Sequence, residues 1–311
     1  MDIKKNKFLL TAFLLMFFVA PAQKQRRHLT ELGLTGMVKT LTERSFAAMD
    51  NFGKAIKGER ATDNSDYTFN KSGNPTEQSI YNQNGSLRVR YAYQYNADEK
   101  LTEQHLYNPG GSLKSKFKYK YNSNGSLGEQ ALYKPDGSLI SKYIYQYDDK
   151  GNQAGYNWYN KEGILDEKAK YVYDANGNQQ GTYSFNADGT QVMGVVYQYD
   201  NRGNIIGEDL YKANDSLDKR TVFVYNAKSN LIEITEFETS GTVSKKIQYK
   251  YDTQNNITEE TWLDKEGNPL DQYTYKYDYD KRQNWTKKIT YRNAVPSIIQ
   301  ERELGYFKGN N

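Results

Sequence analysis

The sequence predicts an all-β fold: a long antiparallel meander of about 20 strands, built from 26-residue β-hairpin repeats. Three observations predict it. One aromatic residue recurs every 26 residues, a second aromatic precedes each one by two positions, and Asn or Asp follows each one. The first series is Phe69, Tyr95, Tyr121, Tyr147, Tyr173, Tyr199, Tyr225, Tyr251 and Tyr277. A fixed period of this size is typical of repeat architectures, in which each unit buries its apolar face against its neighbours.

The chain begins with a segment typical of a secretory signal peptide. Lysines precede an apolar run from Phe8 to Ala20, and Ala20-Pro21-Ala22 offers small residues where a signal peptidase cuts. The run is shorter than the roughly 20 apolar residues that span a membrane. We therefore expect residues 1–22 to be removed and the protein to be exported to the periplasm, the cell surface or the medium. The chain has no cysteine, which excludes both a disulfide and a lipoprotein anchor.

Residues 23–65 are expected to form an irregular capping hairpin. Its strands are Gly36–Phe46 and Lys54–Ala61, joined through residues 50–53. The mature chain would carry 39 basic and 37 acidic side chains, since the signal removes three Lys and one Asp. This near balance gives no electrostatic footprint for nucleic acid, so we expect no nucleic-acid partner.

The repeat array is expected over residues 66–291, and its units read as two strands each. In one unit Tyr143, Tyr145 and Tyr147 alternate with Lys142, Ile144 and Gln146, which is the period of a β-strand. Side chains at every second residue share a face, so the tyrosines of each strand form a column. A second strand ends at an aromatic residue, as at Tyr159.

Two turns separate the strands of each unit. After the first strand, Asp148 can accept backbone N–H bonds and Gly151 supplies a positive φ. After the second strand a glycine recurs in phase, replaced only by Asp215, and Asp tolerates the left-handed conformation. We expect residues 292–311 to be a capping strand and tail. An open sheet of about 20 strands would accumulate large twist, so we expect it to curl with its tyrosine columns on the concave or enclosed side.

The unit Tyr-x-Tyr-Asp-x-x-Gly-Asn, as at Tyr145–Asn152 and Tyr197–Asn204, resembles the YD repeats of the Rhs and wall-associated protein families. The resemblance covers about 220 residues of the 311 in the chain. It implies a β-sheet that spirals into a shell, export, and a role in engaging carbohydrate or enclosing a toxin. This chain differs in its strict period, its short length and the lack of a toxin segment after the array. Hairpin repeats of the MORN type are a second similarity, with a shorter unit.

The residues offer little chemistry for catalysis, so we expect no enzyme activity, no catalytic residue and no cofactor. The two histidines, His28 and His105, lie far apart in the sequence, and there is no cysteine to complete a nucleophile or zinc site. The Asp and Asn residues of the turns could offer oxygen ligands to calcium. Because no bidentate Glu follows and the turns need these side chains, we expect no metal site.

Aromatic side chains are the candidate ligand-binding residues. Trp158 and Trp262 occupy one repeat position, which holds Leu, Ser or Glu in other units, so this position is expected to be partly exposed. Tyr156 and Trp158 are expected on the face away from the tyrosine columns, where they could contact a sugar ring. The other interpretation of these aromatic residues is that they are simply core.

Two classes of function follow. The first is an exported, non-catalytic binding module for a glycan or another cell-envelope component. The second is a structural scaffold that engages a partner protein. No membrane span is expected after signal cleavage. Loss of glycan binding in Trp158→Ala with the fold intact would favour the first, and a specific envelope protein that co-purifies would favour the second.

Overall fold

The computed structural model describes residues 28–62 and 64–308, and the signal peptide expected at residues 1–22 lies outside this part. One short helical turn, α2 (His28–Glu31), precedes 21 strands. The strands are β1 (Val38–Asn51), β2 (Lys54–Arg60), β3 (Asn64–Phe69), β4 (Pro75–Tyr81), β5 (Leu87–Tyr95), β6 (Leu101–Tyr107), β7 (Leu113–Tyr121), β8 (Leu127–Tyr133), β9 (Leu139–Tyr147), β10 (Gln153–Tyr159), β11 (Leu165–Tyr173), β12 (Gln179–Asn186), β13 (Gln191–Tyr199), β14 (Ile205–Lys212), β15 (Leu217–Tyr225), β16 (Leu231–Phe237), β17 (Val243–Tyr251), β18 (Ile257–Leu263), β19 (Pro269–Tyr279), β20 (Trp285–Arg292) and β21 (Val295–Tyr306).

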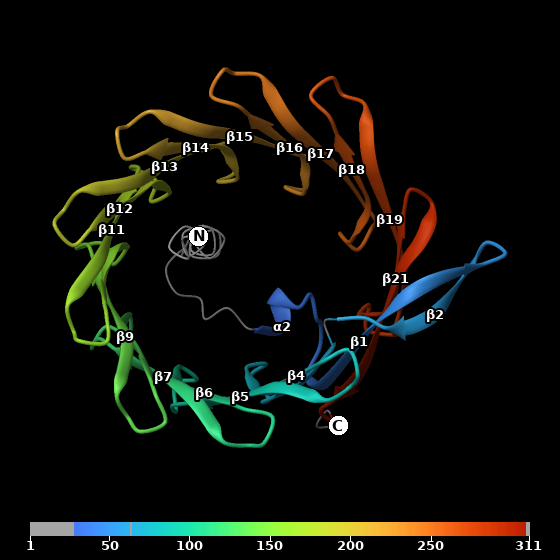
Figure 1. Cartoon of the computed structure of the whole chain (residues 1–311), viewed down its shortest axis with the longest axis horizontal. Coiled ribbons are helices and arrows are strands. Elements are labelled where there is room, and N and C mark those ends of the chain that lie inside the picture. Colours follow the sequence, from blue (N-terminus) through green and yellow to red (C-terminus); the bar gives the residue numbers. More distant parts are fainter. Residues whose placement is uncertain (1–27, 63, 309–311) are drawn as a thin grey trace, which may run out of the picture.

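The strands form a closed barrel, not the curled open sheet expected from the sequence (Figure 1). Strand β1 closes it, because it pairs antiparallel with both β21 and β3. Leu41, for example, lies opposite Leu304 on one side and Tyr67 on the other. Among the described residues the ring therefore holds β1 and β3 to β21, which is 20 of the 21 strands. Closure removes the two unpaired edges that an open meander of this length would expose.

Each unit has the two turns that the sequence predicts. After β9, Asp148 accepts a hydrogen bond from Gly151 N–H and donates one to Asn152 C=O, and Gly151 has φ +84°. The Asp148 carboxylate also accepts the N–H groups of Lys150 and Asn152 at 2.9 and 2.8 Å. Asp215, the one non-glycine in the second turn series, adopts φ +57° as expected. The turn chemistry therefore needs only local residues.

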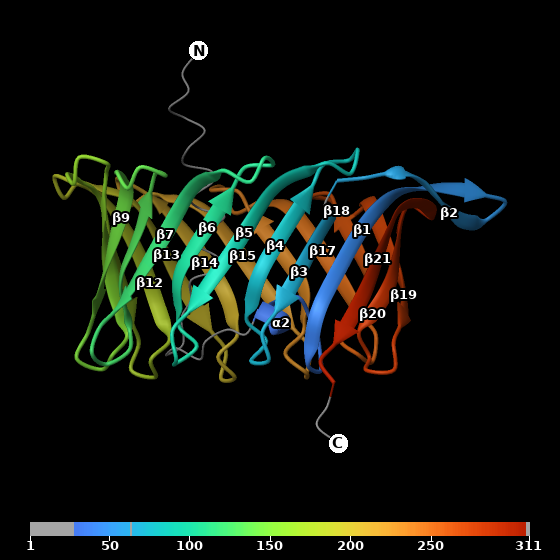
Figure 2. The same cartoon turned by 90° about the horizontal axis from the view of Figure 1, so that it is seen from below.

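The tyrosine columns face the inside of the ring. Helix α2 lies inside the barrel (Figures 1 and 2), and its Leu29 packs in one buried cluster with Phe69 and Leu41, with Tyr67 alongside. Residues directly opposite each other in a ladder share a face. Following the register from Tyr67 around the ring places both aromatic series on the lumenal face. The expected enclosed side is thus the lumen of the barrel.

The expected position of Tyr156 and Trp158 on the opposite face is wrong. In the ladder between β9 and β10, Tyr156 lies opposite Tyr145 and Trp158 opposite Tyr143, so both point into the lumen. The register shifts between Gln153 and Gly155, where β10 carries one extra residue. A bulge of this kind exchanges the two faces for every residue beyond it.

The outer face carries ion pairs between neighbouring strands. Glutamates on β6, β8, β16 and β18 face outward and meet lysines at N···O distances of 2.8–3.5 Å. The pairs are Lys118–Glu103, Lys120–Glu129, Lys246–Glu233 and Lys250–Glu259. No helix within residues 28–62 and 64–308 has the length and apolar character needed to cross a membrane.

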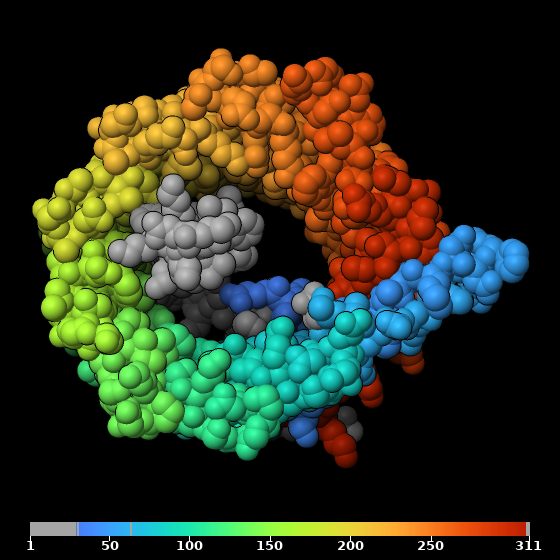
Figure 3. Space-filling model, in the orientation of Figure 1, coloured from blue at the N-terminus to red at the C-terminus, as the bar shows by residue number. Residues whose placement is uncertain are grey.

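Strands β1 and β2 pair antiparallel as a hairpin that projects from the ring (Figures 1, 2 and 3), and β1 runs further, to Asn51, than the strand expected over residues 36–46. Only the first part of β1 belongs to the wall, because its pairing with β21 ends at Ala47 opposite Ile298. Beyond that point β1 pairs with β2 alone, and Phe52 at the tip is fully exposed. The hairpin is therefore an appendage of the barrel.

Candidate functional site

The candidate site is the lumenal wall, where tyrosine side chains are half-buried and fixed by hydrogen bonds. In the middle of the wall, Tyr93, Tyr119 and Tyr145 donate their hydroxyls to glutamine side chains at 3.1–3.2 Å. The acceptors Gln78, Gln104 and Gln130 each lie 15 residues earlier, on the preceding strand. Burial is the largest cause that raises the pKa of these three tyrosines, so their hydroxyls remain protonated donors.

The tyrosines nearest the rim make a second set of bonds. Each hydroxyl donates to the backbone carbonyl of the residue 20 positions earlier, at 2.6–2.9 Å. The donors are Tyr95, Tyr121, Tyr147, Tyr173, Tyr199, Tyr251 and Tyr277. Tyr225 holds the same repeat position, and no bond from its hydroxyl to Ile205 is present in the described structure. The repeat-defining tyrosines thus join consecutive units and line the lumen.

The lumen has a neutral sector and a charged sector. On β3 to β10, the register places aromatic, amide, hydroxyl and aliphatic side chains on the inner face. From β11 to β21 and on β1, the inner face also carries ionisable side chains. They are Glu167, Glu208, Lys219, Glu236, Lys245, Glu260, Asp271, Lys288, Arg292, Arg302 and Glu43. Some are paired within the wall, as are Lys219 and Glu236 at 2.8 Å. The two sectors meet between β10 and β11.

At this boundary lies the aromatic shelf, defined as Tyr143, Tyr156, Trp158, Tyr171 and Glu167. The Tyr156 ring lies edge-on to Tyr143 and Tyr171, with centroids 5.3 and 6.4 Å apart. Tyr156 donates its hydroxyl to Glu167 at 2.6 Å and is 8% exposed. Trp158 is only half-buried and tilts against Tyr143 with centroids 6.4 Å apart. Tyr156 is therefore a buried member of the shelf, and Trp158 is the member with more of its ring exposed to the lumen.

Trp262 holds the same repeat position as Trp158 but lies in different surroundings. The Lys245 ammonium lies 3.8 Å from the centroid of its ring, and its indole N–H donates to Glu260. Tyr275 donates to the other oxygen of Glu260 at 3.2 Å. A lysine covers one face of this ring, so Trp262 is less open to a ligand than Trp158. The structure does not bring the two tryptophans together.

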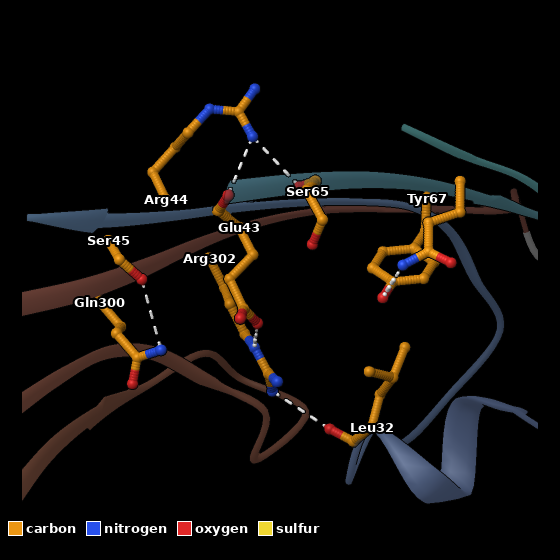
Figure 4. Close-up of polar contacts among 9 residues, drawn as sticks. Leu32, Glu43, Arg44, Ser45, Ser65, Tyr67, Gln300 and Arg302 are labelled. Carbon is orange, nitrogen blue, oxygen red and sulfur yellow. Dashed lines mark hydrogen bonds and ion pairs between the residues drawn. The ribbon is translucent and has the colours of Figure 1, made fainter. Parts of the chain in front are cut away.

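The closing seam adds a polar cluster that sequence reasoning missed (Figure 4). Arg302 on β21 donates to Glu43 on β1 at 2.8 Å and to the carbonyl of Leu32 at 3.2 Å. Its guanidinium also lies 3.6 Å from the ring centroid of Trp285. Arg302 is 7% exposed. The cluster joins both ends of the chain, and no local pattern could reveal it because its members are about 260 residues apart.

Other missed residues left a signal in the sequence. The glutamines that accept the tyrosine hydroxyls recur with the 26-residue period, at 78, 104 and 130. Within residues 28–62 and 64–308, no group of three or more His, Asp or Glu side chains is placed to hold a metal ion. His105 lies on the outer face, where its Nε2 meets Glu103 at 2.6 Å.

Comparisons with known proteins find similarity only among solved structures. No family model matches the chain, and no curated protein matches it. Among solved structures, it is similar to a chain of the Photorhabdus luminescens Tc holotoxin pore, with 11% identity and a TM-score of 0.35. That match covers 86% of this chain but 19% of the toxin chain.

Two porin-like proteins are also similar to the chain. The one from Bacteroides uniformis has 12% identity and a TM-score of 0.36, covering 86% of this chain and 98% of the other. The one from Bacteroides vulgatus has 9% identity and a TM-score of 0.29, covering 88% and 100%.

Proposed function

We propose that the protein is an exported, non-catalytic binding module whose lumen takes a carbohydrate chain, with Trp158 as the principal contact. One observation carries the proposal: Trp158 is only partly buried on the inner wall, where it packs beside Tyr143 and against the buried cluster that contains Tyr156. An aromatic face held in this way offers a platform to the apolar face of a sugar ring. Glu167 lies directly opposite Trp158 in the ladder and can accept hydrogen bonds from sugar hydroxyls.

The neighbouring wall supports the same ligand class. Gln104 and Gln130 on the inner face have amide groups that suit hydroxyl recognition, and the tyrosine hydroxyls beside them stay protonated because burial raises their pKa. The repeat of these groups around the ring suits a polymer with repeated sugars better than a compact small molecule. The absence of any expected catalytic group in the sequence supports a binding role.

Export and a relationship to YD-repeat proteins of the Rhs type are part of the proposal. They rest on the signal-like segment at residues 1–22 and on the unit Tyr-x-Tyr-Asp-x-x-Gly-Asn. Charged side chains in the middle of outward strand faces, such as Lys118 and Glu103, favour a wall that is surrounded by water. We propose no nucleic-acid partner, because basic and acidic side chains are nearly balanced in number and such a chain attracts phosphate groups only weakly.

A scaffold that engages a partner protein is the second candidate function. The projecting β1–β2 hairpin favours it, because Phe52 at its tip is fully exposed and Met49 is 48% exposed. Exposed apolar residues on a protruding element are typical of contact surfaces. This candidate would place the function on the hairpin and leave the lumen as structure.

Glycan arrays followed by calorimetry test the lumenal site. We expect Trp158→Ala to weaken the best-binding neutral oligosaccharide about tenfold or more, which is about 1.4 kcal/mol. Tyr159→Ala is the matched control, because Tyr159 lies one residue further along β10 on the outer face, opposite Lys142. Circular dichroism should show both variants folded. Equal loss in both variants, or no glycan bound by the wild type, would contradict the proposal.

A further inference from the structure

A glutamate recurs at one position on the outer face of the wall, and three consecutive units have glycine there instead. One outward position of the second strand holds glutamate in five units: Glu77, Glu103, Glu129, Glu233 and Glu259. Each of these carboxylates meets a Lys or Arg on a neighbouring strand at 2.8–3.5 Å. In the three units between them, the same position holds Gly155, Gly181 and Gly207. The outer wall over β10 to β14 therefore lacks these carboxylates.

Only one of the three glycine positions stays uncovered by a long side chain. The Tyr183 ring lies over Gly181, where an added Cβ would come within 2.9 Å of it, and Gln198 lies over Gly207 at 3.1 Å. At Gly155 an added Cβ would instead overlap the backbone carbonyl oxygen of Ala169. In the ladders Gly155 lies between Gln146 and Lys170, where glutamate in other units would meet a lysine.

A cleft of about 570 Å³ opens beside this glycine on the outer wall. We call it the outer cleft, and its long side chains are Gln146, Asn157, Lys168, Lys170 and Phe185. The register confirms that they share the outer face, because Lys168 lies opposite both Asn157 and Phe185. Through Ala154 and Lys170 the outer cleft continues into a second groove of about 540 Å³ at the rim.

The outer cleft carries two lysines whose ammonium groups form no close ion pair in the part of the chain that the structure describes. Lys168 and Lys170 form no ion pair within the described residues, whereas Lys118, two units before Lys170, pairs with Glu103 at 3.5 Å. Asp188 is the carboxylate that faces Lys168. Its pKa is lowered first by the hydrogen bonds from Thr190 and to a smaller extent by the charge of Lys168, so Lys168 is partly balanced and Lys170 is the less balanced of the two.

The rim groove adds a third lysine, Lys150, and two carboxylates. Asp148 and Asp174 are both bound within their own turns, where they accept hydrogen bonds from backbone N–H groups and from an asparagine side chain. Neither carboxylate forms an ion pair with Lys168 or Lys170 within the described residues, so both ammonium groups stay available to a ligand.

We propose that the outer cleft binds a carboxylate-bearing polysaccharide, at a site separate from the lumen. Lys168 and Lys170 would pair with the carboxylates of the ligand. They lie two residues apart on β11, so their side chains leave the same face of the strand. Asn157 and Gln146 offer amide groups to sugar hydroxyls, and Phe185 offers a ring face. The two connected grooves suit an extended chain of several sugars. This inference does not depend on the lumenal site, because the side chains that would bind the ligand, Lys168, Lys170 and Phe185, lie on the outer face.

Calorimetry with a short oligogalacturonate, and with a neutral malto-oligosaccharide of equal length, tests the outer cleft. We expect the acidic oligomer to bind and the neutral one to bind at least about tenfold more weakly here. The double variant Lys168→Ala/Lys170→Ala should weaken the acidic oligomer about tenfold or more, whereas Lys168→Arg/Lys170→Arg should retain most of the binding. The loss should shrink as salt is raised, because the contacts are charged and solvent-accessible.

The matched control is Lys116→Ala/Lys118→Ala, which removes the same two repeat positions 52 residues earlier. It should change binding less than about twofold, because Glu103 already pairs with Lys118. Equal losses in the two double variants would overturn the proposal in favour of diffuse attraction. Tighter binding of a single-stranded DNA oligonucleotide, or no binding of the acidic oligomer, would also overturn it. Trp158→Ala should leave oligogalacturonate binding unchanged, because Trp158 lies on the lumenal face. The two proposals can therefore fail independently: the lysine variants test the outer cleft, and Trp158→Ala tests the lumen.

Discussion

At the scale of single residues, one lumenal position shows how the repeat tolerates a change. The tyrosine in the middle of the wall donates its hydroxyl to the side chain 15 residues earlier. In one unit, Tyr275 donates to Glu260 at 3.2 Å. Two units earlier the tyrosine is Phe223, and the acceptor position holds Glu208. Burial raises the pKa of Glu208, although Lys219 acts in the opposite direction. Glu208 therefore has no tyrosine hydroxyl at this position to donate to it, whereas Glu260 accepts one from Tyr275.

We predict that Phe223→Tyr stabilises the protein by about 1 kcal/mol at neutral pH, because the new hydroxyl would donate to Glu208. Urea unfolding would measure the change. The reciprocal variant Tyr275→Phe should destabilise by a similar amount. A destabilised Phe223→Tyr protein would contradict this, since it would mean that the wall has no room for the hydroxyl.

The same glutamate gives a pH-dependent prediction. Burial raises the pKa of Glu208 in the folded protein above its value in the unfolded chain, near 4.5. Its contribution to stability is therefore complete below pH 4.5 and is lost as the pH rises through the pKa of the folded state. Glu208→Gln should therefore stabilise the protein at pH 7 and give no such gain near pH 4. Unfolding midpoints measured across this range would check the sign. A gain of the same size at both pH values would show that ionisation of Glu208 is not the cause.

At the scale of strands, the rim tyrosines connect neighbouring strands beyond the end of their ladder. The ladder between β8 and β9 reaches Ile144 opposite Glu129, and Tyr147 then donates to the Leu127 carbonyl at 2.9 Å. This bond extends the connection towards the rim. Because seven units repeat it, the aromatic period serves hydrogen bonding as well as packing.

We predict that Tyr147→Phe lowers the free energy of unfolding by about 1 kcal/mol, because a partly buried carbonyl loses its donor. Urea midpoints with an unchanged m-value would measure it. Tyr225→Phe is the control, since Tyr225 occupies the same position and its hydroxyl makes no corresponding bond in the described structure. If both variants lose equal stability, the hydroxyl bond contributes nothing measurable.

At the scale of the whole molecule, stability depends on the seam where the ends of the chain meet. Strand β1 pairs with β21 and β3, and Arg302 neutralises Glu43 across this seam while it binds the Leu32 carbonyl. A buried pair of this kind is costly to break, because the remaining charge is left without its partner. The seam therefore joins closure of the ring to the segment that follows α2.

We predict that Arg302→Met lowers the free energy of unfolding by about 3 kcal/mol or more, through the unpaired Glu43. The double variant Glu43→Gln/Arg302→Met should recover part of this loss, and calorimetric melting would measure both. Arg292→Met is the control, because Arg292 pairs with Asp271 at 2.8 Å but is 56% exposed, so its loss should stay below about 1 kcal/mol. Equal effects of the two substitutions would contradict a special role for the seam.

The sequence alone determined the units of this protein. Alternation at Tyr143, Tyr145 and Tyr147 predicted a strand, and Asp148 with Gly151 predicted its turn. These features depend on neighbouring residues, so a single unit contains all the information needed. The constant spacing of 26 residues then predicted that every strand pairs with the next.

Only the tertiary structure decided which side chains share a face and where the chain closes. The extra residue of β10 turns Tyr156 and Trp158 into the lumen, and a shift of one residue leaves no clear mark in a repeat pattern. The outer cleft emerges only when Gly155, Lys170 and Phe185 are placed on neighbouring strands. Closure pairs Leu41 with Leu304, and such distant partners follow from accumulated twist and strand number, not from local residue order.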